Sequence, residues 1–162
     1  MTMPHERTRA VRYGWEYLIE LQESGNITED QRHQIESILR HYPSGGEIKF
    51  SALDCVDTEG PCGPKMSPEH APISSRSPLT PEFVERGTTT PSERTRALLL
   101  ADQLFKELLS APNLTPDQKR QIPYVLRHFP DRHEIKHWAQ MDAWMKSQNP
   151  NFKPWLAPES MP

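Results

Sequence analysis

The stretches Glu93-Arg94-Thr95-Arg96-Ala97 and Leu126-Arg127-His128-Phe129-Pro130 both occur earlier in the chain in nearly the same form. Their counterparts are Glu6-Arg7-Thr8-Arg9-Ala10 and Leu39-Arg40-His41-Tyr42-Pro43. A shift of 87 positions aligns residues 4–49 with residues 91–136 without a gap, and about 21 of the 46 pairs are identical. Because chance would produce only a few identities, the sequence predicts a tandem duplication of one unit.

Each unit has the pattern of two consecutive amphipathic helices. Thr90-Pro91-Ser92-Glu93 is a capping box that predicts the start of the first helix in the second unit. Apolar residues then recur every three or four positions in both units, which predicts one buried helix face. Thr28-x-x-Gln31 and Thr115-x-x-Gln118 predict the start of the second helix, and Pro43 and Pro130 predict its end.

A third helix is indicated most clearly in the second unit. There, Asp131-x-x-Glu134 precedes an apolar pattern that stops at Asn149-Pro150. In the first unit the corresponding segment begins near Ser44 and soon reaches Asp54, so we expect a short helix. Pro123 lies inside the second helix of the second unit and predicts a kink, because proline cannot donate a backbone hydrogen bond.

The predicted fold class is all-α, with two copies of a small unit of two to three helices joined by a disordered proline-rich linker. The units cover residues 1–53 and 89–149, the linker covers 54–88, and a proline-rich tail covers 150–162. Phe152, Trp155 and Leu156 of the tail are expected to fold back on the last helix. One unit buries too little apolar surface for comfortable stability, so two copies in one chain, or in two chains, should pack together.

Composition narrows the cellular setting and the class of protein. Cys55 and Cys62 are the only cysteines, and both fall in the linker, so a disulfide framework is not predicted and a reducing cytoplasm is expected. No stretch approaches the roughly 18 apolar residues of a membrane span, and the first residues do not resemble a signal peptide. The net charge of -3 argues against a protein that mainly neutralises phosphates.

The opening Pro-x-Glu-Arg-Thr-Arg-Ala, followed after about 30 residues by Leu-Arg-His-Tyr/Phe-Pro, resembles a family of short proteobacterial proteins. Those proteins are typically one such unit long, and their function is unassigned. The resemblance covers residues 4–49 and 91–136; the chain departs from the family pattern by carrying two units, and the linker lies outside that pattern. It implies a bacterial cytoplasmic protein and transfers no catalytic residue.

Four arginines recur in the first turns of the first helices, namely Arg7, Arg9, Arg94 and Arg96. A cation at this end of a helix opposes the helix dipole, so each is expected to have a partner. One interpretation is structural, with Glu6, Glu93 or an acid on a neighbouring helix as the partner. The other is a site for an acidic group or phosphate of a bound molecule, which the arginine fork suits.

Arg40-His41 and Arg127-His128 close the second helices. Cations there favour the negative end of the helix dipole, so C-terminal capping is the first interpretation. A general base would also need a nucleophile or an orienting acid nearby, and no such arrangement recurs in both units. Catalytic residues are therefore not predicted.

Two histidine and cysteine groups raise the question of a metal. His128, His133 and His137 have a spacing that can hold zinc or nickel, but the first unit lacks the last two histidines, which favours a solvated helix face. Cys55, Cys62 and His70 are poorly spaced for zinc. Neither a metal nor a cofactor is predicted.

Trp138, Trp144 and Trp155 gather near the end of the sequence. They suit packing of the core and the tail, or alternatively a surface that binds a partner, where tryptophan is enriched.

These observations favour a non-enzymatic helical interaction module, such as an adaptor, inhibitor or immunity-type protein, that binds another protein. The alternative is a DNA-associated transcriptional regulator that uses the second unit. Its residues 91–137 carry eight basic and six acidic side chains, against six and eight in residues 4–50. The candidate partner-binding residues are Arg7, Arg9, Arg40, His41, Arg94, Arg96, Arg127, His128, Trp138 and Trp144.

Overall fold

The computed structural model describes residues 2–54, 66–67 and 89–159, which contain six α-helices. We call residues 2–54 the first half, with α1 (Pro4–Glu23), α2 (Glu29–His41) and α3 (Gly45–Asp54). We call residues 89–159 the second half, with α5 (Pro91–Leu108), α6 (Pro116–Leu126) and α7 (Arg132–Gln148). The described residues form no strand, and the prediction of an all-α protein is confirmed.

The helices begin where the capping boxes predict. Thr28, Thr90, Thr115 and Asp131 are N-caps whose side chains accept a hydrogen bond from the backbone N–H three residues later. The start of α1 is different, because its N-cap Met3 has no side-chain oxygen and only its backbone N–H is satisfied, by Glu6 Oε2 at 2.8 Å. The complete box at the start of a first helix is therefore a property of the second half.

Matching helices of the two halves differ in length. α3 has 10 residues and α7 has 17, which confirms a short third helix in the first half and a long one in the second. α6 contains Pro123 and ends at Leu126, whereas α2 continues to His41, the position that matches His128.

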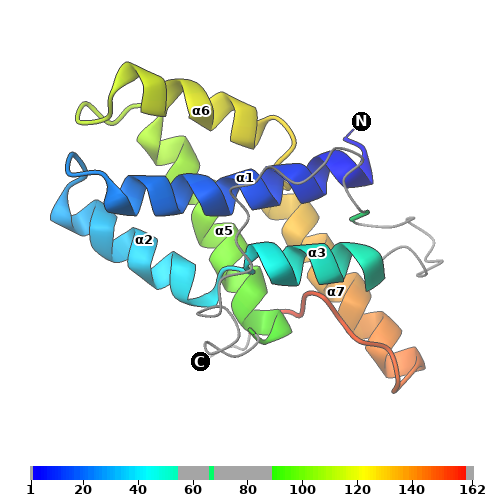
Figure 1. The fold of residues 1–162 in the computed structure, drawn as a ribbon. Coiled ribbons are helices and arrows are strands. Elements are labelled where there is room, and N and C mark those ends of the chain that lie inside the picture. The colour runs from blue at the N-terminus through cyan, green and yellow to red at the C-terminus, as the bar shows by residue number, and fades with distance from the viewer. Residues whose placement is uncertain (1, 55–65, 68–88, 160–162) are drawn as a thin grey trace.

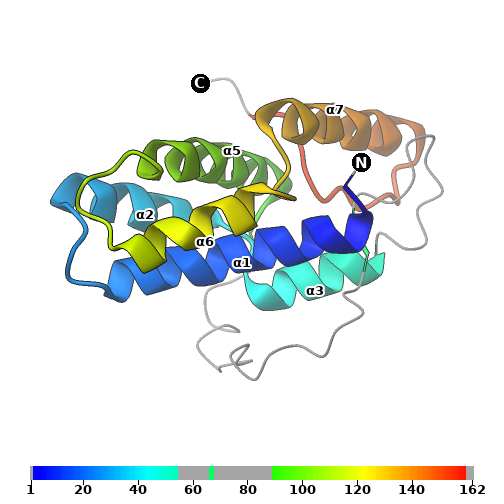
Figure 2. The same ribbon diagram turned by 90° about the horizontal axis from the view of Figure 1, so that it is seen from above.

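The helices pack across the two halves as well as within them. α2 lies against α5, and α6 lies against α1, as Figures 1 and 2 both show. Within the halves, α3 packs on α1 and α7 packs on α5. A single cluster of buried apolar side chains includes residues of all six helices, so the two halves share one core.

Aromatic residues of both halves meet around Gly14 at the middle of α1. Phe105 of α5 contacts Phe129 edge to face at 5.4 Å between ring centroids, and Tyr17 lies 6.0 Å from Phe105. A Cβ atom on Gly14 would lie 2.8 Å from the Tyr42 hydroxyl and 3.2 Å from Phe129. Gly14 therefore allows the close approach of these rings to α1.

A short segment beyond each third helix returns to the first helix of its own half. Ser67 accepts a hydrogen bond from Thr8 Oγ1 at 2.7 Å, and Ala157 accepts one from Thr95 Oγ1 at the same distance. Met66 and Leu156, which precede these residues, are fully buried.

These contacts decide two predictions about the segments outside the units. The prediction that Trp155 and Leu156 fold back is confirmed, since Asp142 Oδ2 of α7 accepts their backbone N–H groups at 3.0 and 2.9 Å. The prediction of a disordered linker is wrong for Met66 and Ser67, because burial and hydrogen bonding attach them to α1. Residues 55–65 and 68–88 of the predicted linker lie outside the described residues. Among the helices described, none is both long and apolar enough to cross a membrane.

Candidate functional site

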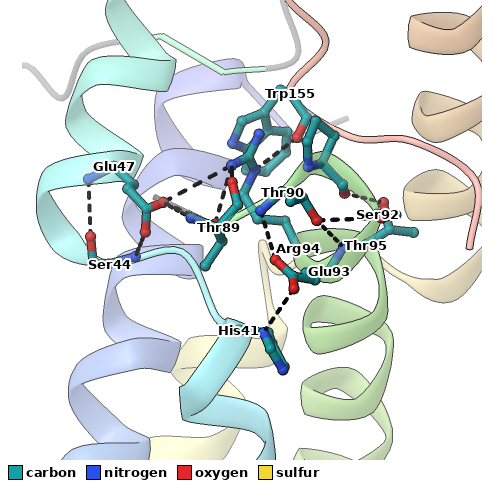
Figure 3. A network of polar contacts seen from close by, with 11 residues as sticks. His41, Ser44, Glu47, Thr89, Thr90, Ser92, Glu93, Arg94, Thr95 and Trp155 are labelled. Atoms are coloured by element: carbon teal, nitrogen blue, oxygen red, sulfur yellow. Dashed lines mark hydrogen bonds and ion pairs between the residues drawn. The ribbon is translucent and has the colours of Figure 1, made fainter. Parts of the chain in front are cut away.

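The recurring polar residues meet at the boundary between the halves, and one cluster of them lies at the start of α5 (Figure 3). Thr90 caps this helix by accepting a hydrogen bond from the Glu93 backbone N–H at 3.4 Å. Glu93 Oε2 in turn accepts one from the Thr90 backbone N–H at 2.8 Å. The capping box thereby fixes the Glu93 carboxylate, and its other oxygen lies 3.6 Å from Nδ1 of His41 on α2. The hydrogen bond from the Thr90 backbone, followed by smaller contributions that include His41, holds the pKa of Glu93 below its usual value.

Arg94 is the centre of this cluster, and its side chain is only 12% exposed. Its guanidinium donates hydrogen bonds to the backbone carbonyls of Trp155, at 2.8 Å, and of Thr89, and it lies 4.0 Å from Glu47 Oε1 of α3. Burial lowers the pKa of Arg94, while the negative charges of Glu47, Asp142 and Glu93 oppose that shift. For Arg94, the contact with Glu47 agrees with the structural interpretation, in which an acid on a neighbouring helix is the partner.

Glu47 receives contacts from both halves. Its Oε1 accepts hydrogen bonds from the backbone N–H and the hydroxyl of Thr89, each at 2.9 Å, and its Oε2 accepts one from the Ser44 backbone N–H at 2.9 Å. The N-terminus of α3, the N-terminus of α5 and the C-terminal tail are thus joined through Glu47 and Arg94.

A matching glutamate–histidine contact lies at the start of α1. Glu6 Oε2 accepts a hydrogen bond from the Met3 backbone N–H and lies 3.7 Å from His128 Nδ1. The Met3 hydrogen bond is the main cause of a lowered pKa at Glu6, and His128, His5 and Arg127 add smaller contributions in the same direction. Each recurring histidine therefore faces the recurring glutamate of the other half.

The loops before α2 and α6 are also hydrogen-bonded to each other. Asn26 Nδ2 donates to the Asn113 carbonyl at 2.9 Å, and Asn113 Nδ2 donates to the Asn26 carbonyl at 2.8 Å. Asn26 also donates to Gln118 Oε1, and Asn113 donates to Gln31 Oε1, both at 2.7 Å. Each glutamine is also the last residue of a capping box and the third residue of its helix, so one side chain caps a helix and binds the opposite half.

The candidate partner-binding residues divide into two groups by position. The first group makes contacts within the chain, and it consists of Arg7, His41, Arg94, His128 and Trp138. The Arg7 guanidinium lies 5.3 Å from the centre of the Trp138 ring. The second group faces outward, and it consists of Arg40, Arg96, Arg127 and Trp144. Arg9 is half-buried on α1. Partner binding by any of these residues stays a prediction.

The tryptophans divide in the same way. Trp138 is 8% exposed, and its ring lies 6.3 Å from that of Trp155, so this pair packs the tail onto α7. Trp144 is 51% exposed on the same helix.

Sequence reasoning missed the residues that join the halves, above all Asn26 and Asn113. Their recurrence at the 87-residue spacing was visible, and neither asparagine is needed to cap its own helix, because the threonine two positions later does so. An unexplained asparagine in both units was thus the available signal. Asp142 had no such signal, because its partners are backbone N–H groups of the tail.

No group of three histidine, cysteine or acidic side chains is arranged to hold a metal ion within the described part of the chain. His128 faces Glu6, while His133 and His137 are exposed on α7. Cys55, Cys62 and His70 lie outside the described residues.

Imidazole–carboxylate pairs can serve as general bases when a nucleophile lies within hydrogen-bond reach. Here the carboxylates of Glu6 and Glu93 are also fixed by backbone N–H groups of helix N-termini, and their contacts join helices of opposite halves.

Comparison of the chain with family models, with curated proteins and with solved structures finds no match.

Proposed function

We propose that the chain is a tandem duplication of one helical unit and acts as a non-enzymatic protein-interaction module in a bacterial cytoplasm. An adaptor, an inhibitor and an immunity-type protein are the forms of activity that this proposal includes. The observation that supports this proposal is that the recurring polar residues bind the opposite half of the chain. Asn26, Gln31, His41 and their counterparts bind the opposite half, so the recurring part of the sequence serves the scaffold.

Two outward-facing aromatic residues of the second half, in contrast, have no aromatic counterpart in the first half. Tyr124 is 72% exposed on α6, and its counterpart on α2 is Ser37. Trp144 is half-exposed on the helix that is long only in the second half. Exposed aromatic side chains are enriched among the residues that dominate protein–protein binding. We therefore assign the binding of another protein to the second half, through Tyr124 and Trp144.

The test is recovery of partners by the full chain from a bacterial lysate. Tyr124→Ser introduces the residue that the first half has at this position, and Trp144→Ala removes the exposed indole. We expect a protein retained by the wild type to be lost from both variants. Leu109→Ala is the control, because Leu109 is 46% exposed and lies in neither α6 nor α7. Equal recovery by all four proteins would reject this surface.

DNA binding is the second candidate, and the exposed basic residues of α6 and α7 favour it. Arg120, Arg127, Arg132 and Lys136 all face outward in the second half. Phosphate contacts make affinity fall steeply with salt, so duplex DNA should bind at about 50 mM salt and dissociate by about 200 mM. Absence of binding at the lower concentration removes this candidate, and Arg127→Ala should weaken any binding that is seen.

A further inference from the structure

Two sets of polar contacts across the boundary are reciprocal. Asn26 binds Asn113 in the same way that Asn113 binds Asn26, and the His41–Glu93 and His128–Glu6 distances agree to 0.1 Å. Contacts related in this way are the property of an isologous interface, in which the same surface is used on both sides. Here both sides belong to one chain.

The second half contains a counterpart for every first-half side chain that binds it through a recurring polar contact. It binds Glu6, Asn26, Gln31 and His41, and the residues 87 positions later are Glu93, Asn113, Gln118 and His128. These four pairs have the same residue type. A second copy of the second half would therefore present the same donors and acceptors as the first half does.

The apolar centre of the boundary is also compatible with such a copy. The first half combines Gly14 with Tyr42, whose hydroxyl lies 2.8 Å from the place of a Gly14 Cβ atom. The second half has Ala101 in place of Gly14 and Phe129 in place of Tyr42. The methyl group that Ala101 adds is therefore accompanied by the loss of the tyrosine hydroxyl. The 3.2 Å approach of Phe129 to the same place would still require a small shift of the ring.

We propose that this boundary is a homotypic docking surface, through which the second half binds the second half of another copy of this chain. One contact has no equivalent in that pairing. Tyr17 Oη donates to the Gln118 carbonyl at 3.0 Å, and its counterpart Leu104 has no hydroxyl. The proposal rests on the recurring contacts and does not depend on Tyr124 or Trp144.

The first half competes for the same surface within each molecule. Because both halves belong to one chain, the first half is an intramolecular partner, with an effective concentration on the order of millimolar. Pairing between molecules therefore becomes visible at lower concentrations when the first half is weakened.

The first experiment tests the complementarity in the full chain. Residues 4–49 are replaced by the sequence of residues 91–136, which has the same length. We expect a helical monomer that unfolds in one cooperative transition, by circular dichroism and analytical ultracentrifugation. A chain that aggregates or lacks a cooperative transition would contradict the proposal. Alanine at both Asn26 and Asn113 of the replaced chain should lower its melting temperature by several degrees.

The second experiment tests pairing between molecules. The full-length triple variant Asn26→Ala, Gln31→Ala, His41→Ala removes the first-half side of the reciprocal contacts. At about 100 μM we expect a dimer of the variant and a monomer of the wild type in sedimentation equilibrium. A triple variant that stays monomeric, or that has lost its helices at this concentration, overturns the proposal.

The control adds Asn113→Ala, Gln118→Ala and His128→Ala to the same chain. These changes remove the polar contacts of the proposed docking surface, so dimers should disappear. Dimers that persist in this sixfold variant would show association through another surface and would overturn the proposal as well.

Discussion

At the residue scale, neighbouring arginines of one motif have opposite environments. Arg94 and Arg96 are two positions apart on α5, yet Arg94 is buried among carbonyls and Glu47 while Arg96 faces solvent. A helix turns by about 100° per residue, so positions two apart lie on different faces. The motif therefore contains a structural arginine and a surface arginine, which the sequence alone presents as equals.

This difference makes a matched pair of variants informative. Arg94→Ala should lower the free energy of unfolding by about 2–3 kcal/mol, because it removes charge-assisted hydrogen bonds and leaves carbonyl acceptors without their donor. Arg96→Ala should change it by less than about 0.5 kcal/mol, as expected for an exposed site. Urea unfolding of both variants gives the comparison, and equal losses would contradict the structural role of Arg94.

Gly14 gives a second residue-scale prediction. Gly14→Ala should destabilise the protein by about 1–2 kcal/mol, because crowding against the buried Tyr42 hydroxyl outweighs the gain of roughly 0.5–1 kcal/mol in helix propensity. Adding Tyr42→Phe should recover part of the loss, since the double variant reproduces the Ala101–Phe129 pair of the second half. A double-mutant cycle by thermal unfolding measures this coupling, and strictly additive effects would argue against it.

At the element scale, the start of each helix was predictable and the choice of neighbours was not. Thr28, Thr115 and Asp131 cap helices through hydrogen bonds that span three residues, so the information is local. The packing of α2 on α5 depends on side chains far apart in the sequence. The apolar face of a helix indicates that the face is buried, but it does not identify the helix that packs against it.

Part of the candidate site was also predictable from the sequence, and part of it was not. Recurrence identified Arg94, His41 and His128, but the glutamate that faces each histidine lies on the other half. The sequence indicated C-terminal capping for both histidines, which is a local interaction. Their contacts with Glu93 and Glu6 join residues far apart in the sequence. Asp142 was missed because a carboxylate that binds backbone N–H groups leaves no pattern in side-chain types.

The attachment of the C-terminal tail to α7 depends on Asp142, which is fully buried. Asp142→Ala should destabilise the protein by about 2 kcal/mol, because two buried backbone N–H groups, of Trp155 and Leu156, lose their acceptor. Release of the tail should also expose Trp155 and shift tryptophan emission to longer wavelength. Asp117→Ala is the control at an exposed aspartate of α6, and it should leave the emission unchanged.

At the scale of the whole molecule, acid should destabilise the fold through Glu6 and Glu93, which lie at the starts of α1 and α5. The pKa of Glu6 and of Glu93 is lowered in the folded protein, chiefly by hydrogen bonds from the Met3 and Thr90 backbones. The unfolded chain therefore takes up protons on these groups at a higher pH than the folded chain does. Their stabilising contribution is present above the ordinary glutamate range and is lost as the pH falls through the folded-state pKa.

Urea midpoints measured between about pH 6 and pH 3 test this dependence, since ordinary glutamates titrate near the middle of that range. The midpoint of the wild type should fall toward acid pH, and the double variant Glu6→Gln, Glu93→Gln should show a shallower fall. An unchanged pH dependence in the double variant would contradict a role for these two carboxylates. Glu159→Gln, at an exposed position of the tail, is the matched control.

The reciprocal hydrogen bonds of Asn26 and Asn113 have a consequence for how this protein can change over generations. In an assembly of two identical chains, one codon change alters both sides of such a contact at once. Here each side has its own codon, so one side can vary while the other is kept. The first half combines Gly14 with Tyr42 and the second half combines Ala101 with Phe129, so one gene product encodes two different combinations at matching positions.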